Sequence, residues 1–365
     1  MTELKLRTIF AGAILLLLGA CTEPAPVFHA DERPLRLSDW QLFTLQADSL
    51  TPSESSVVFR PNNPLFTDYA HKLRTLWIPA GLSAELLDDE LSYPVGTILS
   101  KTFYYPRAAG GSLRKAADPG LQKIDLIENQ LIETRLLVRK SDGWDAFPYV
   151  WNDEQTEAFL RIAGASKAVS LVDQEQGEAI DFTYFVPNEN QCAGCHTTVH
   201  PNGDMHPLGA IYSQLNARAS EAEGDSTLAQ MVGRGWLSEQ MSFPGSVAWQ
   251  DSRAPLPDRA LAYLNMQCGH CHNASGAADT SGLILDNPQA SPINRGVCKP
   301  PVAAGGGAGN LRYSIVPGQP QQSILLYRMR SEKPDEMMPE LGRSLIHNEG
   351  IELISRWIGE MSGSC

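Results

Sequence analysis

The sequence predicts a chain of two parts, a β-rich, sandwich-like domain over residues 35–187 and a mainly α-helical region over residues 188–365. The first prediction rests on short runs of β-branched and aromatic residues that alternate with turn signals. The second rests on apolar residues that recur at helical spacing. A third observation marks the helical region, because it contains two C-x-x-C-H pentapeptides, at Cys192–His196 and Cys268–His272.

Six runs in the first part have the composition of β-strands. They are Arg74–Ile78, Thr97–Tyr105, Leu131–Arg139, Ala146–Trp151, Ala168–Val172 and Asp181–Val186. Turn-forming residues, such as those at Gly110-Gly111 and Asp142-Gly143, separate several of these runs. Short strands joined by tight turns favour an antiparallel sandwich or a similar β-rich domain. A helix is expected only locally, over Leu82–Leu87.

Three helices are expected in the second part. Pro257–Met266 has apolar residues at helical spacing and leads into the second pentapeptide, and Ser323–Arg330 and Asn348–Met361 are further candidates. We divide this part into a first segment over residues 188–256 and a C-terminal domain over residues 257–365, each with one pentapeptide.

The C-x-x-C-H pentapeptide is the attachment signal for a c-type haem. Its two thiols can each add to one vinyl group of the haem, and the imidazole that follows can bind the iron. The sequence therefore predicts two covalently bound haem c groups. Their attachment residues would be Cys192, Cys195, Cys268 and Cys271, with His196 and His272 as iron ligands.

Two other uses of these cysteines remain open. A four-cysteine zinc site would use both C-x-x-C pairs but would leave the two histidines unexplained. A thioredoxin-like redox pair needs a single C-x-x-C near a βαβ pattern, which the sequence does not contain. Haem attachment accounts for the cysteines and the histidines together, and it is the interpretation that we favour.

The N-terminus has the features of an export signal. Lys5 and Arg7 precede an apolar run from Thr8 to Ala20, which is too short to span a bilayer. Residues 1–20 are therefore predicted to be a signal peptide. Export agrees with the haem motifs, because c-type haem is attached outside the cytoplasmic membrane.

The residues at the end of this signal, Leu18–Cys21, resemble a bacterial lipobox. The resemblance implies cleavage before Cys21 and acylation of that cysteine, with residues 21–34 as a flexible tether. An ordinary secretory signal cut near Ala20 is the alternative. Thr22 follows the cysteine in place of Asp, which by the rule for enteric-type bacteria implies the outer membrane. We expect an exported protein, anchored by lipid in the periplasm at the outer membrane.

The overall charge bears on the partners. The formal net charge is −13 at pH 7, which argues against binding to nucleic acid. An acidic surface suits a redox partner protein with a basic patch, although it serves solubility equally well. The expected partners are therefore redox proteins of the cell envelope, together with the membrane that the lipid anchor would enter.

Two of the seven cysteines have no role in lipidation or haem attachment. Cys298 and Cys365 form an even pair in an oxidising compartment, where thiols commonly pair as disulfides. We hypothesise that a disulfide ties the C-terminus to the glycine-rich loop over residues 296–309.

Residues 260–357 resemble a cytochrome c domain in the order of their motifs. A helix delivers the second pentapeptide, and Pro317 stands where such domains commonly accept the proximal imidazole's N–H on a backbone carbonyl. The resemblance implies that Met338 is the second ligand of the iron held by His272, with Met337 as the close rival. Packing of both methionines without ligation is a further alternative. A thioether ligand would raise the reduction potential.

The second iron ligand at the first motif is less well defined. Met205 is the leading candidate and His206 the next, because a loop over these residues could wrap around the haem. The remaining candidates are His200, Met231 and Met241. A five-coordinate iron with an open face is also compatible with the sequence. His270, inside the second motif, is expected to point away from the iron.

Further motifs extend over nearly the whole chain. They are Asn63–Lys72, Tyr93–Thr97, Leu131–Leu137, Pro148–Asn152, Asn190–His196, Gly296–Pro301, Ile315–Pro320 and Met337–Arg343. Together they resemble a largely uncharacterised bacterial family of dihaem c-type cytochromes, which are often lipoproteins. The resemblance implies haem binding and electron transfer but supplies no substrate. We interpret Asp68 and His71, in the first of these motifs, as folding determinants in preference to a partner surface.

The function expected from these features is membrane-tethered electron transfer in the bacterial cell envelope. One alternative is a dihaem oxidoreductase, peroxidase-like or a small-substrate dehydrogenase, which acts at the first haem. A second alternative is an envelope binding module that carries the haems as accessories. The electron carrier is preferred over an enzyme.

Overall fold

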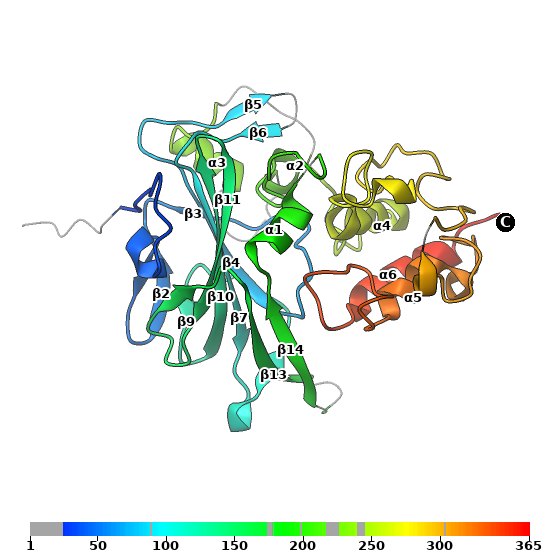
Figure 1. The fold of residues 1–365 in the computed structure, drawn as a ribbon, viewed down its shortest axis with the longest axis horizontal. Coiled ribbons are helices and arrows are strands. Elements are labelled where there is room, and N and C mark those ends of the chain that lie inside the picture. Colours follow the sequence, from blue (N-terminus) through cyan, green and yellow to red (C-terminus); the bar gives the residue numbers. More distant parts are fainter. Residues whose placement is uncertain are drawn as a thin grey trace, which may run out of the picture.

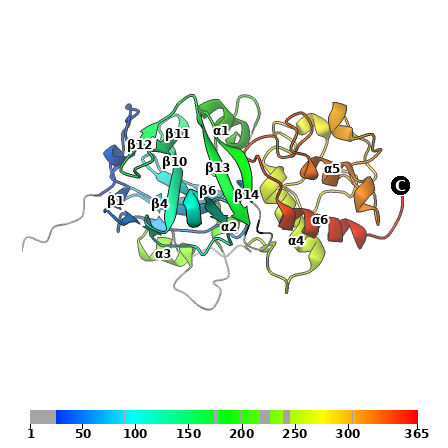
Figure 2. The ribbon, with the colours of Figure 1, turned by 90° about the horizontal axis from the view of Figure 1, so that it is seen from below.

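The computed structural model describes residues 25–87, 90–173, 177, 179–197, 199–216, 226–238, 245–302 and 304–365. The predicted signal peptide, the predicted lipidation residue Cys21 and the ligand candidate Met241 lie outside the described residues. Most strands gather in one half of the molecule (Figure 1), and the helices α4 (Leu256–Leu264), α5 (Ile324–Arg330) and α6 (Asn348–Gly359) gather in the other. The view turned by 90° shows the same two halves (Figure 2).

A six-stranded antiparallel sheet, which we call the main sheet, forms the centre of the β-rich half. In spatial order its strands are β12 (Ala158–Leu160), β11 (Gly143–Trp151), β10 (Asn129–Lys140), β7 (Ile98–Pro106), β4 (His71–Trp77) and β3 (Val57–Val58). Side chains along each strand point alternately to the two faces of the sheet, and residues of both faces are buried.

Three smaller sheets surround the main sheet. They consist of β1 (Phe43–Leu45), β2 (Ser49–Pro52) and β9 (Ile124–Asp125); of β8 (Leu113–Lys115), β13 (Ala165–Asp173) and β14 (Ala179–Val186); and of β5 (Glu85–Leu87) and β6 (Glu90–Ser92). All the strand runs predicted from the sequence fall on strands, namely on β4, β7, β10, β11, β13 and β14. The prediction of a β-rich first part is confirmed.

The helix expected over Leu82–Leu87 is wrong. Glu85–Leu87 is the strand β5, which pairs with β6 through Leu86 and Leu91. Leu86 is buried while its two neighbours are exposed, so burial alternates with the two-residue period of a strand. A run this short also gains too few hydrogen bonds to offset the cost of starting a helix.

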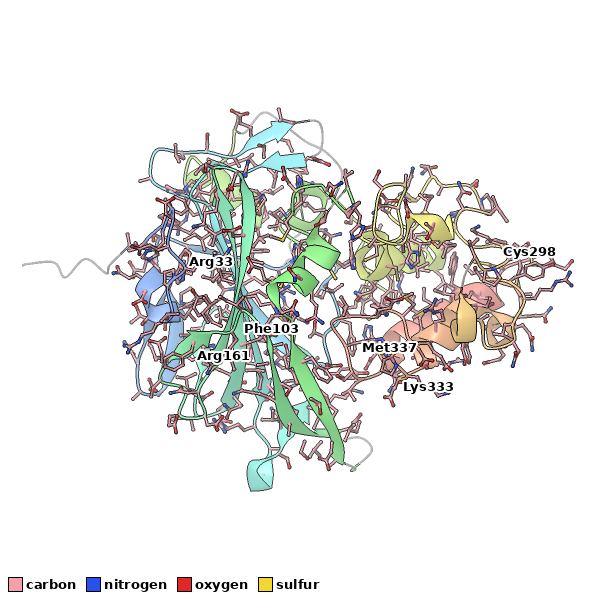
Figure 3. The ribbon with its side chains drawn as sticks, in the orientation of Figure 1. Arg33, Phe103, Arg161, Cys298, Lys333 and Met337 are labelled. Atoms are coloured by element: carbon pink, nitrogen blue, oxygen red, sulfur yellow. A yellow bond between two sulfur atoms is a disulfide. The ribbon has the colours of Figure 1, made fainter. Side chains whose placement is uncertain are left out.

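The two faces of the main sheet pack against different elements. The sheet of β1, β2 and β9 covers one face through an apolar cluster that includes Trp40, Leu50 and Ile124. Two clusters lie on the other face. The first contains residues of α1 (Glu189–His196), α2 (Tyr212–Leu215) and α3 (Thr227–Gly233). The second contains residues of β13 and β14 together with Phe103, which lies in the middle of the β-rich half (Figure 3).

The helices predicted over Pro257–Met266, Ser323–Arg330 and Asn348–Met361 are present as α4, α5 and α6. Their apolar sides form one cluster with Trp249, which precedes α4. The helix residues of this cluster include Tyr263, Leu326, Met329, Ile354 and Trp357. A π-helical turn, η3 (Asn265–Gly269), continues α4 into the second pentapeptide. None of the helices in the described ranges is long and apolar enough to cross a membrane.

Cys298 and Cys365 are joined by a disulfide, as hypothesised from the cysteine count. The bond closes a loop with a sequence separation of 67 residues. It links the last residue of the chain to the segment that follows Gly296, where the chain pairs with Ile315. The C-terminus is therefore tied to the helical half by a covalent bond.

One segment of the β-rich half binds α2 at its start and the helical half further along. We call residues 62–69 the clasp segment. Its first residues bond to the segment from α2 to Trp249: Asn62 bonds to Ser213 and Ser246, and Asn63 bonds to Gln214, Val247 and Trp249. Phe66 bonds to Gln267, next to the second pentapeptide. Its last residues bond to the segment before α6 and to the start of α6, with Asp68 bonded to Ser344 and Leu345 and Tyr69 bonded to Ile346 and Asn348. Most of these bonds involve main-chain groups, so the clasp segment fixes the path of the backbone that carries the second pentapeptide.

Candidate functional site

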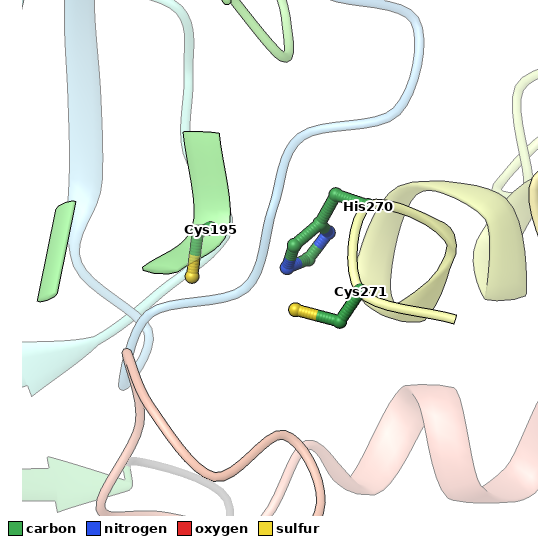
Figure 4. Close-up of side chains that lie close together, drawn as sticks. All are labelled: Cys195, His270 and Cys271. Carbon is green, nitrogen blue, oxygen red and sulfur yellow. The ribbon is translucent and has the colours of Figure 1, made fainter. Parts of the chain in front are cut away.

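The two C-x-x-C-H pentapeptides meet at the junction between the two halves. Cys195 comes from α1, and His270 and Cys271 come from the turn that follows α4; their side chains face one another (Figure 4). The ligand atoms of these three residues all lie within 4.8 Å of one another. The Cys271 thiol also lies 3.8 Å from the carbonyl oxygen of Gly194. The sequence predicted each motif but gave no sign that they would meet.

Local structure explains the position of the first pentapeptide. Asn188 caps α1, since its side chain accepts the N–H of Gln191, and the Gln191 side chain in turn accepts the N–H of Asn188. This reciprocal pair satisfies two N–H groups that the helix start would otherwise leave unbonded. The helix ends at His196, so the two cysteines and the histidine occupy its final turns.

The second pentapeptide is a compact turn. The N–H groups of Cys271 and His272 both donate to the carbonyl oxygen of Cys268, at 3.1 and 2.9 Å. Gly269 is closely packed, because a Cβ at this position would lie 3.0 Å from the backbone of Asp286. A π-helical turn of this kind is frequent at functional sites.

Each histidine of the pentapeptides is held through its Nδ1 atom. His196 Nδ1 lies 2.7 Å from the carbonyl oxygen of His206, so this nitrogen carries the proton and donates it. His272 Nδ1 lies 3.0 Å from Ser281 Oγ, and Ser281 Oγ donates to the carbonyl oxygen of Ala278 at 2.6 Å. The hydroxyl is therefore the acceptor for His272. In both rings Nε2 is left as the atom that can bind a metal.

The hydrogen-bond acceptor of the His272 ring differs from the one expected from the sequence. Pro317 was expected to accept the imidazole N–H, by resemblance to cytochrome c domains, but Ser281 occupies that role. Ser281 belongs to a 3₁₀ turn, Asp279–Ser281, only nine residues beyond the histidine. The short loop brings this hydroxyl to the ring before the chain reaches Pro317.

Both imidazoles are suited to metal binding in their charge state. Burial, with the positive charge of Lys101, lowers the pKa of His196 to about 4. Burial, with the charge of Arg328, lowers the pKa of His272 to about 4. Both rings are therefore neutral near pH 7, which is the form that ligates a metal.

The thiols in contact also differ from ordinary cysteine. A hydrogen bond from Cys271, with the nearby His270, lowers the pKa of Cys195 to about 4. Burial raises the pKa of Cys192, and it raises that of Cys268 to about 12. None of the four cysteines in the pentapeptides forms a disulfide in the structure. All four thiols are therefore available for covalent attachment.

Each pentapeptide lines its own cavity. The first cavity has a volume of about 1550 Å³ and is lined by Cys192, Cys195 and His196. The second has a volume of about 1420 Å³ and is lined by Cys268, Cys271 and His272. Residues that line both cavities are Cys195, Gln267, Cys268, His270, Met329, Met338, Pro339 and Leu341. The two cavities are therefore neighbours that share a wall.

Of the two neighbouring methionines, only Met338 lines these cavities. Met337 is buried and lines neither cavity, at the edge of the helical half (Figure 3). The Arg343 guanidinium holds the loop in place by donating to the carbonyl oxygens of Met338 and Ser331, both at 2.9 Å. This geometry favours Met338 over Met337 as a ligand for a metal in the shared region.

Met329 is a cavity residue that the sequence reasoning missed. It lies on α5 and lines both cavities, as Met338 does. The available signal was its place on the apolar side of the predicted helix Ser323–Arg330, three positions after Leu326. Met266, on the turn before Cys268, lines the first cavity as well.

The structure gives no support to Met205 as a ligand in the first cavity. Met205 pairs with Thr197 and packs against the apolar cluster of α1 to α3, and it does not line the cavity. The physical reason is the bond between His196 Nδ1 and His206, which holds this loop on the side of the ring opposite Nε2. His206, His200 and Met231 do not line the cavity either.

His270 differs from the expectation that it would point away from the site. It lines both cavities and lies against the two thiols of Cys195 and Cys271. The three residues could together bind a metal ion such as Zn²⁺. A structural zinc site requires four ligands, and no larger group of metal-binding side chains is found among the residues with defined positions. Such a site would also leave Cys192, Cys268 and both cavities without a role.

No protein-family model matches the chain, and the searches of curated proteins and of solved structures found no match. We therefore infer the chemistry of the site from its own residues.

Proposed function

We propose that this protein is a dihaem c-type cytochrome that transfers electrons in the bacterial cell envelope. The observation that carries the proposal is the meeting of two C-x-x-C-H pentapeptides, each lining its own cavity, with Cys195 and Cys271 in contact. An electron carrier with two redox groups needs them to be close to each other. Attachment points in contact meet that need.

The residues present fit a haem in each cavity. Each cavity offers two thiols for the vinyl groups and one neutral imidazole with its Nε2 free. Apolar side chains line much of both cavities, such as Leu99 and Leu137 in the first and Leu285 and Ile324 in the second. An apolar cavity with a few placed polar groups is the usual surrounding of a bound cofactor.

The chain would contribute attachment, ligation and orientation. Cys192 and Cys195 would hold one haem and Cys268 and Cys271 the other, with His196 and His272 as iron ligands. Haem c, when bound, supplies a reversible one-electron couple whose potential depends on its ligands and burial. Ser281 and the His206 carbonyl would fix the two imidazole rings and strengthen them as donors.

Met338 is proposed as the second ligand for the iron held by His272, as the resemblance implies. Its position in the wall between the two cavities supports this role. A helical haem-binding part, with a first segment over 188–256 and a cytochrome c domain over 257–365, belongs to the same proposal. Among the described residues, every α-helix follows β14, which supports it.

The proposed location is the periplasmic side of the outer membrane, with a lipid on Cys21 and redox proteins as partners. The support is the sequence of the N-terminus and the net charge of −13. The Cys298–Cys365 disulfide supports an oxidising compartment in addition.

A dihaem oxidoreductase that acts at the first haem is the second candidate. One observation favours it: the side chains expected as second ligand, Met205 and His206, do not line the first cavity, while several cationic side chains do. The histidines and methionines that do line this cavity, besides His196, are Met266, His270, Met329, Met338 and His347. If none of them binds the iron, one face of it would be accessible to a substrate.

Expression with the native signal in a bacterium that matures c-type cytochromes tests the proposal. A pyridine haemochrome assay should find two haems per chain, and Cys192→Ala with Cys195→Ala should leave one. Cys298→Ser with Cys365→Ser is the matched control, which should keep both haems. Metal analysis that finds zinc and no haem in the mature protein would contradict the proposal. Low-temperature electron paramagnetic resonance of the oxidised protein would separate two six-coordinate haems, the carrier, from one with an open face, the enzyme.

A further inference from the structure

Three cationic side chains form a row across the main sheet. Arg74 on β4 lies directly opposite Lys101 on β7, and Lys101 lies directly opposite Arg135 on β10. All three therefore point to the same face of the sheet, and all three line the first cavity. Like charges at directly opposite positions repel each other. The arrangement is unfavourable unless something in the cavity balances it.

Only one member of the row has an anionic partner. Arg135 donates to both carboxylate oxygens of Glu133, at 2.5 and 2.8 Å. Within the described part of the chain, no hydrogen bond or ion pair joins the side chain of Arg74 or Lys101 to another group. Lys101 Nζ has a ring contact, 5.3 Å from the centroid of Phe103, which does not neutralise its charge. Arg74 and Lys101 therefore lack a carboxylate in direct contact, although Asp118 acts on Arg74 and Glu133 acts on Lys101 from a greater distance.

Arg74 is the most deeply buried of these unpaired groups, with 7% of its surface exposed. The carboxylate that acts on it electrostatically is Asp118, whose oxygens accept the N–H groups of Lys72 and Gly120. Asp118 also lies 3.7 Å from Arg60, a more exposed cation. This carboxylate is thus shared among other groups, and it forms no hydrogen bond with Arg74.

The electrostatic cost of the row is visible in the pKa values of its members. Burial, with the charges of Arg135 and Arg74, lowers the pKa of Lys101 to about 7. Burial lowers the pKa of Arg74 to about 10. Desolvated cations of this kind are stabilised when an anion binds beside them.

The row lies next to the first pentapeptide. The adjacent row on the same face of the sheet, Leu99, Leu137 and Ala146, is apolar and also lines the cavity. The charge of Lys101 lowers the pKa of His196, and the charge of Arg135 opposes the rise that burial causes in the pKa of Cys192. The floor of the first cavity therefore combines an apolar strip with a cationic strip, beside the residues proposed to hold a haem.

We propose that Arg74, Lys101 and Arg135 form an anion-binding site in the first cavity, which holds a carboxylate or a small oxyanion beside the first C-x-x-C-H motif. Guanidinium groups bind planar oxyanions through two parallel hydrogen bonds, and an ammonium group adds a point charge. The anion has two conceivable sources with this chemistry. One is the carboxylate edge of the haem attached at Cys192 and Cys195, which rests on the proposed function. The other is a free oxyanion, which does not depend on it.

The test uses variants that remove charge with little change of shape. Arg74→Gln and Lys101→Met each remove one cation that has no direct anionic partner. Arg135 is left unchanged because its loss would leave the buried Glu133 carboxylate with the Tyr184 hydroxyl but no cation beside it. Arg139→Gln is the matched control, since Arg139 lies on β10, two rows from Lys101, and does not line either cavity. Arg74→Lys keeps the charge and serves as a rescue variant.

The first measurement is calorimetric titration of the mature protein with sodium sulfite and sodium nitrite as probes. A free-anion site predicts binding that weakens at high salt. Arg74→Gln and Lys101→Met should each lower the affinity by about tenfold or more, the loss of one charge-assisted hydrogen bond. Arg139→Gln should leave the affinity unchanged, and Arg74→Lys should restore part of it.

The second measurement is the midpoint potential of each haem. If the haem's own carboxylates occupy the site, the probes should not bind the mature protein. Removal of either cation should then lower one midpoint potential, because positive charge near a haem favours its reduced form. The control Arg139→Gln should leave both potentials unchanged.

Absence of probe binding together with unchanged potentials in both charge-removing variants would overturn the anion site. If the mature protein contains no haem, the proposed function is wrong. Titration with sulfite would still show whether the site binds an anion. The two proposals are therefore tested separately.

Discussion

The carboxylate of Asp68 accepts the main-chain N–H of Leu345 at 2.7 Å, and the same oxygen accepts that of Ser344 at 2.7 Å. Asp68 belongs to the clasp segment of the β-rich half, and Leu345 follows the Met338 loop in the helical half. The Asp68 backbone has a φ of 48°, in the left-handed region that Asp and Asn tolerate best. Asp68 thus joins two distant segments of the chain, the contact that a folding determinant would make.

Asp68→Asn should change how stability depends on pH. Burial raises the pKa of Asp68 to about 6 from an ordinary value of 3.8, against the opposing effect of its two backbone hydrogen bonds. The folded state therefore holds a proton that the unfolded state has lost, and this group's stabilising contribution falls as pH rises from about 4 to about 6. The asparagine keeps the acceptor oxygen and removes the titration, so the variant should be more stable at pH 7 by up to about 3 kcal/mol.

Urea unfolding of the wild-type protein and the variant at a series of pH values measures this difference. The free-energy gap between the two should open between pH 4 and pH 6 and stay constant above pH 7. A constant gap across the whole range would contradict the assignment of the raised pKa to Asp68.

Gln267→Ala should weaken the junction that supports the second pentapeptide. Gln267 is buried; its amide oxygen accepts the N–H of Phe66 at 2.9 Å, and its amide nitrogen donates to Pro64 at 3.0 Å. Its loss leaves a buried N–H and a buried carbonyl unbonded, which costs about 2–4 kcal/mol. Denaturant unfolding measures the loss, with the exposed Gln289→Ala as the control. A change below about 0.5 kcal/mol would show that water replaces the amide.

Ser281→Ala should raise the midpoint potential of the haem at His272. The hydroxyl accepts the Nδ1 proton and so strengthens the imidazole as a donor to oxidised iron. Loss of about 1 kcal/mol of this stabilisation corresponds to about 40 mV for one electron. Potentiometric titration should show the shift in one haem only, with Ser291→Ala as the control. An equal shift in both haems would point to a general structural change instead.

Met338→Leu should abolish the near-infrared sulfur-to-iron band of the oxidised protein, while Met337→Leu should retain it. The reason is geometric, because Met338 lines the shared wall of the cavities and Met337 does not. Met329→Leu is a third variant, since this residue lines the same wall. Loss of the band in Met329→Leu and its retention in Met338→Leu would move the ligand role to α5.

Cys298→Ser with Cys365→Ser should lower stability by about 4 kcal/mol, the effect expected for a loop of this length. Thermal unfolding with and without reductant measures the change, and reductant should have no further effect on the variant. Titration of the denatured, unreduced wild-type protein should find no free thiol from this pair. Two reactive thiols would contradict the disulfide.

Much of the local structure could be predicted from the sequence. Runs of β-branched and aromatic residues between turn signals identified β4, β7, β10 and β11 of the main sheet, and helical spacing identified α4, α5 and α6. Leu82–Leu87 failed because a short apolar run fits either period, and only its pairing with β6 decides between them. Met205 does not line the first cavity, and closeness in sequence could not say on which side of the imidazole its loop would lie.

By itself the sequence indicated the chemistry that we propose for this protein. The two C-x-x-C-H motifs and the even pair of remaining cysteines are patterns of neighbouring or countable residues, and no folding is needed to recognise them. Only the tertiary structure decided that the two motifs touch, that Met338 and not Met337 lines the shared wall, and that Arg74, Lys101 and Arg135 form one row. These relationships depend on strand register and on the packing of one half against the other, which join residues that are far apart in the chain.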